Sequence, residues 1–188
     1  MQSDEILIAA VANGDESAFE ELVDKNKLII FNLINQFLNN HTETEDLAQE
    51  VFIKVWRYAR TFNPKYKFST WIYRITVNTC LNYRKSRKSS PLRDSLHENE
   101  ISDIINPDEK QPDKLIEIAE RNSLITQTLL HLPPNQRMAL ILSQFEERSY
   151  KDIADIMEIT VPAVESLIFR AKSYLKDKLL PLKDKYQL

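Results

Sequence analysis

The chain has 188 residues and a formal net charge of −3 at pH 7, and its 43% hydrophobic and 28% charged residues are typical of a soluble globular protein. Its single glycine, Gly14, argues against sheet-rich folds, because tight turns between strands depend on glycine. The lone Cys80 excludes an internal disulfide bond and favours a reducing compartment. No signal peptide is visible, and no apolar run reaches the roughly 18 to 20 residues that cross a bilayer, so we expect a cytoplasmic protein.

The first half of the chain predicts four helices. Ser3 can cap a helix over 4–12, and a longer helix over 15–38 has apolar residues at spacings of three, four and seven. The Thr42 and Glu45 pair is a capping-box pattern for a helix that reaches about residue 60. After an Asn-Pro break, Ser69 is expected to cap a helix from residue 70 to about residue 88.

The second half predicts four more helices after a linker. Residues 89–112 hold three prolines among serines and acids, which is typical of a connecting segment. Helical patterns follow at 113–132, 134–145, 150–157 and 161–180. We therefore expect an all-α protein of two small helical domains, with residues 1–90 as the first domain, 91–112 as an acidic linker, and 113–188 as the second.

The last two predicted helices form a helix-turn-helix pattern. Ser149 with Asp152 is a capping box for the first helix, and Thr160 can cap the second. The second helix has a buried stripe, so its opposite face is free to enter a DNA major groove and contact bases or phosphates; that face includes Glu165, Ser166, Phe169, Arg170 and Lys172. A plain helical hairpin with a solvated polar face fits the same spacing, because helix pairs are common.

Charge is strongly segregated along the chain. Residues 1–50 contain eleven acids against two bases, whereas residues 51–93 contain eleven bases and no acid. The basic block suits a polyanion, and the acidic block suits a basic protein partner.

Within the basic block, Arg74, Asn78, Asn82 and Lys85 step by four, four and three along one helix face. Asparagine can contact base edges, and the cations can neutralise phosphates. Just upstream, aromatic and cationic residues alternate, a combination that suits unstacked single-stranded bases: Phe62, Lys65, Tyr66, Lys67 and Phe68. The alternative is that these rings are core anchors and the charges only increase solubility.

Within the acidic block, Asp46, Gln49 and Glu50 share a helix face, which a solvated surface explains equally well. The three histidines show no metal-ligand spacing, and neither a phosphate-binding loop nor a nucleophile motif is present. We therefore expect no enzyme activity, no cofactor, no metal site and no small-molecule substrate.

Two groups of motifs resemble one known family. Residues 46–56 (DLAQEVFIKVW) and 68–78 (FSTWIYRITVN) closely resemble region 2 of extracytoplasmic-function sigma factors of bacterial RNA polymerase. Residues 132–137 (LPPNQR), with 149–154 (SYKDIA) and 169–172 (FRAK), resemble region 4 of the same family. The two groups occur in the family's order and together cover almost the whole chain.

The resemblance implies a sigma factor that directs RNA polymerase to promoters. It places the Asp46, Gln49 and Glu50 helix on the clamp helices of the polymerase largest subunit. It places the loop from Phe62 to Ser69 and the helix of Asn78 and Asn82 on the −10 promoter element as it melts, with the cations beside them on phosphates. It places Glu165, Ser166 and Arg170 on the −35 element. It also implies an anti-sigma factor as a partner.

The chain departs from the family pattern in the helix-turn-helix. Glu158 stands where the turn often has glycine, and a left-handed conformation there would cost a non-glycine residue roughly 1 kcal/mol or more. Glu165 and Leu167 stand where basic residues are frequent, and Pro162-Ala163 replaces a common Gly-Thr pair. These changes weaken the expected phosphate contacts at the −35 element.

Two alternatives remain open from the sequence. The first is a helix-turn-helix regulator that binds duplex DNA without polymerase and carries a helical sensor domain. The second is a protein-interaction module whose basic block binds an acidic protein instead of DNA.

Overall fold

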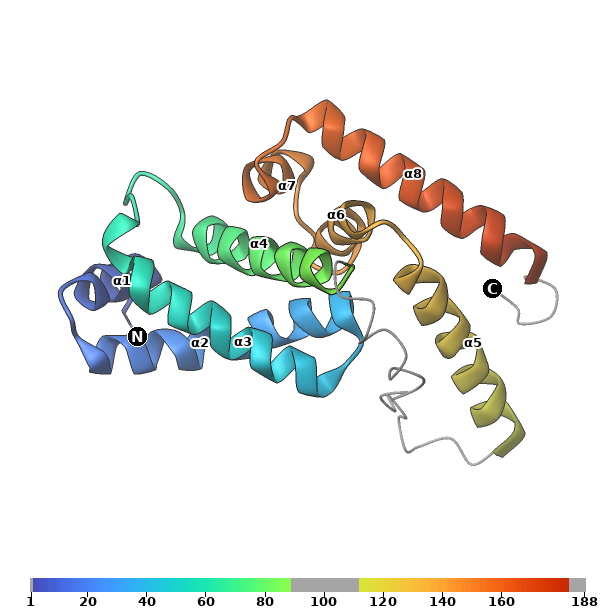
Figure 1. The fold of residues 1–188 in the computed structure, drawn as a ribbon, viewed down its shortest axis with the longest axis horizontal. Helices are drawn as coiled ribbons and strands as arrows, with labels where there is room; N and C mark the ends of the chain where they lie inside the picture. Colours follow the sequence, from blue (N-terminus) through green and yellow to red (C-terminus); the bar gives the residue numbers. More distant parts are fainter. Residues whose placement is uncertain (1, 89–111, 183–188) are drawn as a thin grey trace.

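A computed structural model describes residues 2–88 and 112–182, and within these residues every regular element is a helix and there is no strand (Figure 1). The all-α prediction is confirmed. The elements in chain order are α1 (Asp4–Ala12), α2 (Glu16–Leu38), α3 (His41–Tyr58), the 3-10 turn η1 (Ala59–Thr61), α4 (Phe68–Lys88), α5 (Pro112–Leu130), α6 (Pro134–Gln144), α7 (Tyr150–Met157), α8 (Val161–Leu179) and η3 (Leu180–Leu182). Of the expected linker at 91–112, only Pro112 is among the described residues.

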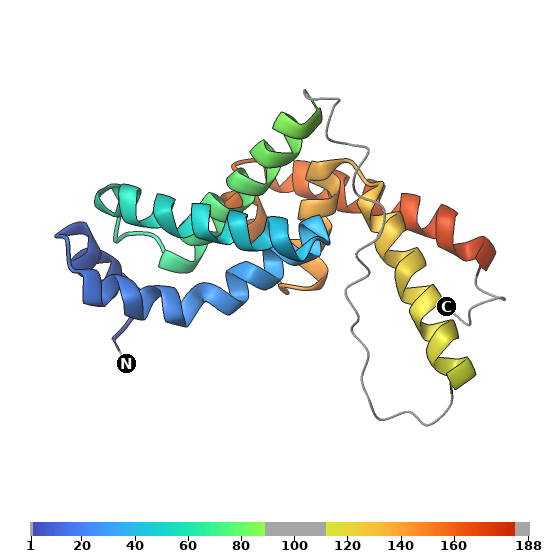
Figure 2. The same cartoon turned by 60° about the horizontal axis from the view of Figure 1, so that its bottom comes forward.

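Helices α1 to α4 form a bundle in which α2 and α3 run side by side and α4 packs across them (Figures 1 and 2). The apolar stripes predicted from the sequence meet at its centre, where Leu22, Ile34, Val51 and Val55 are completely buried. None of the described helices combines the length and the apolarity that a bilayer crossing requires.

The cap of α3 differs from the expected one. Asn39 adopts a left-handed conformation with φ of 53°, which ends α2 and leaves Asn40 extended. The Asn40 side chain accepts a hydrogen bond from the backbone N–H of Glu43 at 2.9 Å, so the helix begins two residues earlier than the Thr42 and Glu45 pattern suggested. The Thr42 capping box is therefore wrong, because two polar residues compete at this end and the tight α2–α3 connection selects Asn40.

The helix-turn-helix prediction is confirmed in its caps and its turn. The Ser149 hydroxyl accepts a hydrogen bond from the backbone N–H of Asp152 at 3.1 Å, and Thr160 accepts one from Ala163 at 3.4 Å. The turn residue Glu158 is left-handed, with φ of 56°. A glutamate therefore occupies a conformation that favours glycine, at a cost of roughly 1 kcal/mol.

The two halves of the described chain share one continuous buried core. Buried residues of α6 and α7, among them Met138, Ile141 and Ile153, join the same apolar cluster as α2, α3 and α4. Helices α5 and α8 add a smaller cluster around Leu132 and Ala171 on the far side of α6. The two halves that we expected as separate small domains therefore pack extensively against each other.

A buried cation lies in this shared core. Arg137 of α6 is completely buried, and its guanidinium carbon lies 4.5 Å from the centre of the Phe37 ring of α2. One of its nitrogens donates to the carbonyl oxygen of Leu130 at 3.3 Å, but its Nε and Nη2 have no partner among the described residues. Burial lowers the Arg137 pKa to about 10, and the nearby Arg84 cation lowers it further.

Replacing Asn40 with alanine is expected to lower the free energy of unfolding by about 1 kcal/mol, because the Glu43 N–H loses its acceptor. Urea titration followed by circular dichroism measures this difference. Thr42→Ala is the matched control, since Thr42 is an exposed residue inside the first turn. If Thr42→Ala were the more destabilising of the two, the assignment of Asn40 as the cap would be wrong.

Candidate functional site

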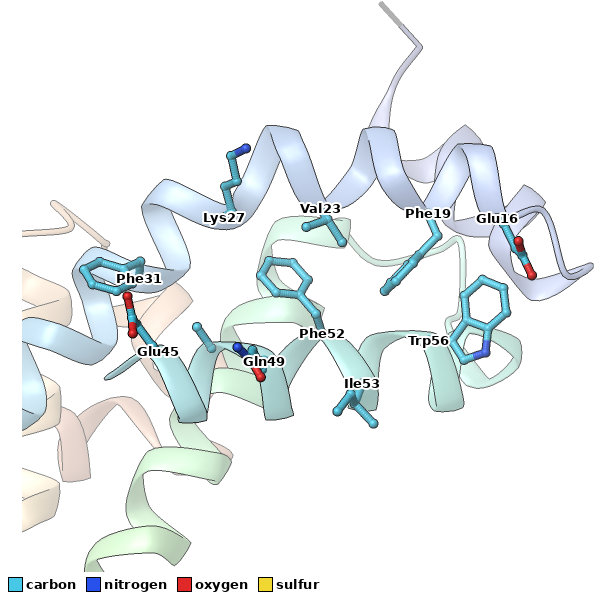
Figure 3. A pocket seen from close by; sticks show the side chains of 11 residues that line it. Glu16, Phe19, Val23, Lys27, Phe31, Glu45, Gln49, Phe52, Ile53 and Trp56 are labelled. Atoms are coloured by element: carbon cyan, nitrogen blue, oxygen red, sulfur yellow. The ribbon is translucent and has the colours of Figure 1, made fainter. Parts of the chain in front are cut away.

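An open apolar groove runs between α2 and α3 (Figure 3). It has a volume of about 1000 Å³ and is lined mainly by rings and aliphatic side chains, including Phe19, Val23, Phe52, Ile53 and Trp56. Ile53 is 57% exposed and Trp56 is 39% exposed, which is unusual for large apolar side chains on a soluble surface. The groove is therefore suited to an apolar, elongated partner such as a helix.

Of the three polar residues predicted on α3, only Gln49 lines the groove. Asp46, Gln49 and Glu50 are all exposed. Glu50 pairs with Lys54 at 2.6 Å, and Lys54 also donates to the hydroxyl of Thr79 at 3.0 Å. Asp46 has no ion-pair partner among the described residues. Its charge is therefore less neutralised than that of Glu50.

The loop before α4 is anchored by three rings. Phe62, Phe68 and Trp71 meet with ring centres 5.6 to 6.1 Å apart, and Phe68 is completely buried. Phe62 is half-buried within this cluster, so for Phe62 and Phe68 the structure favours the core role that the sequence left open. Tyr66 is 67% exposed between two exposed lysines, Lys65 and Lys67. Tyr66 is therefore the loop ring that has a face available for stacking.

The start of α4 is held by a residue of α1, 63 positions earlier in the chain. The backbone N–H of Phe68 donates to Glu5 Oε1 of α1 at 3.3 Å. The Ser69 cap expected from the sequence is wrong, because Ser69 lies inside the helix. Hydrogen bonds from the backbone N–H groups of Glu5 itself and of Phe68 hold the pKa of the Glu5 carboxyl below its usual 4.5.

The predicted face of α4 is only partly open. Asn78, Asn82 and Lys85 are exposed along one side of the helix. Arg74, which belongs to the same predicted set, is held by α7: its Nη2 donates to the Asp155 carbonyl at 2.7 Å, and its Nη1 lies 3.2 Å from Glu158. The structure thus leaves three of the four residues on a free surface, whereas the guanidinium of the fourth is bound to α7 although its side chain is still 39% exposed.

Tyr73, next to Arg74, makes a second contact that the sequence did not indicate. Its hydroxyl donates to Glu146 at 2.5 Å, and the Arg148 guanidinium carbon lies 4.2 Å from the centre of its ring. Burial, with the hydrogen bond to Glu146, raises the pKa of Tyr73 to about 12. The tyrosine is therefore a neutral donor at physiological pH, and it ties α4 to the segment between α6 and α7.

The predicted face of α8 is fully open to solvent. Glu165, Ser166, Arg170 and Lys172 are all exposed. Phe169 lies on the same face and is 72% exposed. Sequence reasoning placed this ring on the polar face but did not single it out, although an aromatic residue opposite the buried stripe was the available signal.

The described residues hold no group of three histidine, cysteine or acidic side chains arranged for a metal ion. Cys80 is buried in the core, and burial raises the pKa of its thiol to about 12. Its thiolate is scarce at neutral pH, so Cys80 is a core residue and not a nucleophile.

Sequence profiles of known families cover most of the chain. The profile of Sigma-70 region 2 matches residues 22–90, and that of Sigma-70 region 4 matches residues 123–175. The RNA polymerase sigma-H factor of Pseudomonas aeruginosa is 35% identical over 185 residues, and the match covers 96% of each chain. The ECF RNA polymerase sigma-E factor of Escherichia coli K12 is 32% identical over 184 residues, with the same coverage of both.

Two solved structures have the same fold. CnrH, solved in complex with the cytosolic domain of CnrY, superposes with a TM-score of 0.65 at 24% identity, covering 95% of this chain and 97% of CnrH. The sigma factor RpoE of Bartonella quintana, solved with the anti-sigma factor NepR, gives a TM-score of 0.66 at 19% identity, covering 86% and 96%.

Removing the Glu5 carboxylate is expected to free the Phe68 amide. In Glu5→Ala this amide should exchange with deuterium about fivefold faster, because it loses a charged acceptor. The contribution of Glu5 is present above about pH 4.5 and is lost as the pH falls through its lowered folded pKa. Exchange followed by NMR at neutral pH measures the effect. Glu20→Ala, which removes an exposed acid from α2, is the control; equal Phe68 exchange in both variants would contradict the contact.

Proposed function

The chain belongs to the sigma-70 family, in its extracytoplasmic-function group, and from this premise we propose how its surfaces divide the work of promoter recognition. As a sigma factor it binds core RNA polymerase and directs it to promoters. We assign residues 1–90 to region 2, 91–112 to the linker and 113–188 to region 4. In this proposal the chain is not an enzyme. It contributes binding energy and positions the polymerase on the promoter, and the polymerase catalyses transcription in the cytoplasm.

The α2–α3 groove is proposed to bind the clamp helices of the polymerase largest subunit. An apolar groove with exposed aliphatic and aromatic side chains fits the apolar face of a helix, and aromatic residues contribute most to such interfaces. Gln49 lines the groove, and the exposed acids Asp46 and Glu50 of the same helix provide charge and hydrogen-bond acceptors for a basic partner. Asp46, whose charge no described cation neutralises, is expected to contribute most among the acids.

The loop and the open face of α4 are proposed to hold the −10 element. Flipping a base out of the duplex costs a few kcal/mol of stacking, which a new aromatic contact can offset. Tyr66 offers the exposed ring for such a contact, and Phe62 supports the loop from within the ring cluster. The remaining members contact base edges or phosphates: Lys65, Lys67, Arg74, Asn78, Asn82 and Lys85.

The exposed face of α8 is proposed to contact the −35 element. Arg170 and Ser166 can donate to base edges or phosphates, Lys172 can neutralise a phosphate, and Glu165 can accept from a cytosine amino group. Phe169 adds an apolar surface that fits a thymine methyl group. With few cations on this face, most of its contribution is expected to come from base contacts rather than phosphate contacts.

An anti-sigma factor is proposed as a further partner, since RpoE of Bartonella quintana was solved bound to one. Such a protein would act by covering the polymerase-binding and DNA-binding surfaces named above. Membership in the family supports the role in transcription. Our assignment of surfaces rests on one observation: the apolar α2–α3 groove, with the exposed acids of α3, is separate from the basic, open face of α4.

Reconstituted transcription tests the proposed function. Purified core polymerase is incubated with fragmented genomic DNA, with and without this chain, and the 5′ ends of the transcripts are mapped. We expect start sites that depend on the chain and that share two upstream elements. A chain that associates with core polymerase but yields no new start sites would refute the promoter assignment.

Asp46→Arg is expected to reduce the affinity for core polymerase at least tenfold, because a repulsive charge replaces an attractive one beside the groove. Fluorescence anisotropy with labelled chain measures the affinity, and circular dichroism verifies the fold. Glu20→Arg is the matched control, since Glu20 is an exposed acid of α2 that does not line the groove. Equal losses in both variants would mean that net charge, and not this groove, governs binding.

Asn78→Ala is expected to slow open-complex formation several-fold while leaving the affinity for core polymerase unchanged, because Asn78 faces DNA and lies away from the groove. Permanganate reactivity of unpaired thymines in the −10 region measures the open complex. Ser17→Ala, an exposed change on α2, is the control. Wild-type rates of opening in Asn78→Ala would remove Asn78 from the DNA-binding set.

A further inference from the structure

A second pocket lies beside the α2–α3 groove, where the C-terminal ends of α1 and α3 meet the turn η1. It has a volume of about 400 Å³, and its walls include Val11 of α1, Ile53, Trp56 and Arg57 of α3, and Arg60 of η1. Ile53 and Trp56 also line the groove, so these two side chains separate the two hollows (Figure 3). We call the smaller hollow the Trp56 pocket. None of the surfaces assigned above includes its two arginines.

The Trp56 pocket is cationic. Among the described residues two arginines and no acid line it. Arg57 is exposed and makes no ion pair or hydrogen bond with any residue that the structure describes. Arg60 donates its Nε to the carbonyl oxygen of Ala12 at 3.1 Å, which orients the guanidinium and leaves both Nη groups without a described partner. Because a guanidinium matches the oxygens of a phosphate, the pocket suits a phosphate group.

An aromatic ring forms another wall of the Trp56 pocket. Trp56 is 39% exposed, and an edge contact with Phe19, with ring centres 5.0 Å apart, holds its orientation. Nucleobases stack on such rings, and arginines beside the ring bind the backbone of the same strand. A volume of about 400 Å³ lies within the range of small-ligand sites and exceeds what a phosphate alone requires. The pocket therefore has the chemistry and the size for a nucleotide.

The Trp56 pocket adjoins the loop that we assign to the −10 element. Arg60 precedes Phe62, the first residue of that loop, by two positions, and Tyr66 follows Arg60 by six. Six residues span at most about 21 Å, which about six nucleotides of one strand cover at roughly 3.4 Å each. Sites for single strands commonly hold about 4 to 16 nucleotides. A strand that stacks on Tyr66 therefore reaches the pocket within one site of ordinary length.

The order of the surfaces along region 2 gives the side of the −10 element on which the pocket lies. The C-terminal end of α4, beyond Asn78, Asn82 and Lys85, leads through residues 91–112 to region 4, which we assign to the upstream −35 element. Helix α1 lies at the other end of the bundle, where α4 begins (Figures 1 and 2). The pocket beside α1 is therefore on the downstream side.

We propose that the Trp56 pocket binds a nucleotide of the unpaired promoter strand just downstream of the −10 element, with the base on the Trp56 ring and the phosphates on Arg57 and Arg60. The assignment rests on the proposed function of the loop and of α4. A nucleotide held there opposes closure of the melted duplex. An acidic side chain of the polymerase would also pair with the arginines, but a carboxylate has no ring to stack on Trp56.

The test uses fork-shaped promoter DNA and holoenzyme assembled from core polymerase and the full chain. The promoter is one identified by the reconstituted transcription. Both forks are duplex through the −35 element and single-stranded at the −10 element; the short fork ends there, and the long fork continues for six unpaired nucleotides. Arg57→Gln is expected to bind the long fork about fivefold more weakly than wild type and the short fork equally well. Arg121→Gln, the same change on α5, is the matched control.

Two further measurements separate the phosphate contact from the base contact. On the long fork, Arg57→Gln should reduce the slope of log affinity against log salt concentration by about 0.7, since one contact to a single-strand phosphate is lost. An abasic site moved along the extension should weaken wild-type binding at one position, where the base stacks on Trp56. An abasic site without effect at every position would overturn the stacking of a base in the pocket.

The comparison of the two forks keeps the proposal distinct from the proposed function. Wild-type holoenzyme that binds the short fork but gains nothing from the extension would overturn the pocket assignment and leave the proposed function standing. A weaker affinity of Arg57→Gln for core polymerase would assign Arg57 to the polymerase interface instead. Equal losses on the long fork in Arg57→Gln and Arg121→Gln would mean that net charge explains the effect, which would also overturn the proposal.

Discussion

Helix α4 packs into the core, contacts α7 and presents a solvent-exposed face, and the rest of the molecule is arranged around it. One side supplies Phe68, Ile72 and Val77 to the core of the α1–α4 bundle. A second side supplies Tyr73 and Arg74 to α7 and its flanking segment, and a third presents Asn78 and Asn82 to solvent. Because a helix repeats every 3.6 residues, its side chains fall into only a few such faces, and a residue between two faces is shared by both. Arg74 is such a residue: it belongs to the face that we propose for DNA, and its guanidinium donates a hydrogen bond to α7.

The sequence predicts local features of this fold well. The helix-turn-helix caps at Ser149 and Thr160 follow from short-range hydrogen-bond patterns, and the structure contains both. The amphipathic stripe of α8 likewise identifies the exposed face of Glu165, Ser166 and Arg170 before any coordinates are known. Charge segregation, visible by counting residues, separates the α3 surface from the α4 surface and supports the division of labour that we propose.

The features that the sequence does not predict are contacts between distant residues. Glu5 holds the start of α4 from 63 residues away, and no local pattern distinguishes it from a solvated acid. No local pattern predicts the pairing of Arg74 with Glu158 across the two halves either. The only signal was that Glu158 stands where the family often has glycine. For the ring cluster of Phe62, Phe68 and Trp71 the sequence gives a signal but not its meaning. Aromatic residues beside cations are compatible with both a core and a nucleic-acid surface. Burial, which only the fold provides, places Phe68 in the core, and Phe62 packs half-buried against it.

The central claim is that the α2–α3 groove and the open face of α4 serve different partners. The affinity for core polymerase and the rate of promoter opening, measured side by side on variants of either surface, test it most directly. The account predicts that changes at the groove weaken the association with polymerase, whereas changes at Asn78 or Asn82 slow promoter opening in a polymerase complex that forms normally. Variants of the two surfaces that lose both properties to the same extent would contradict it.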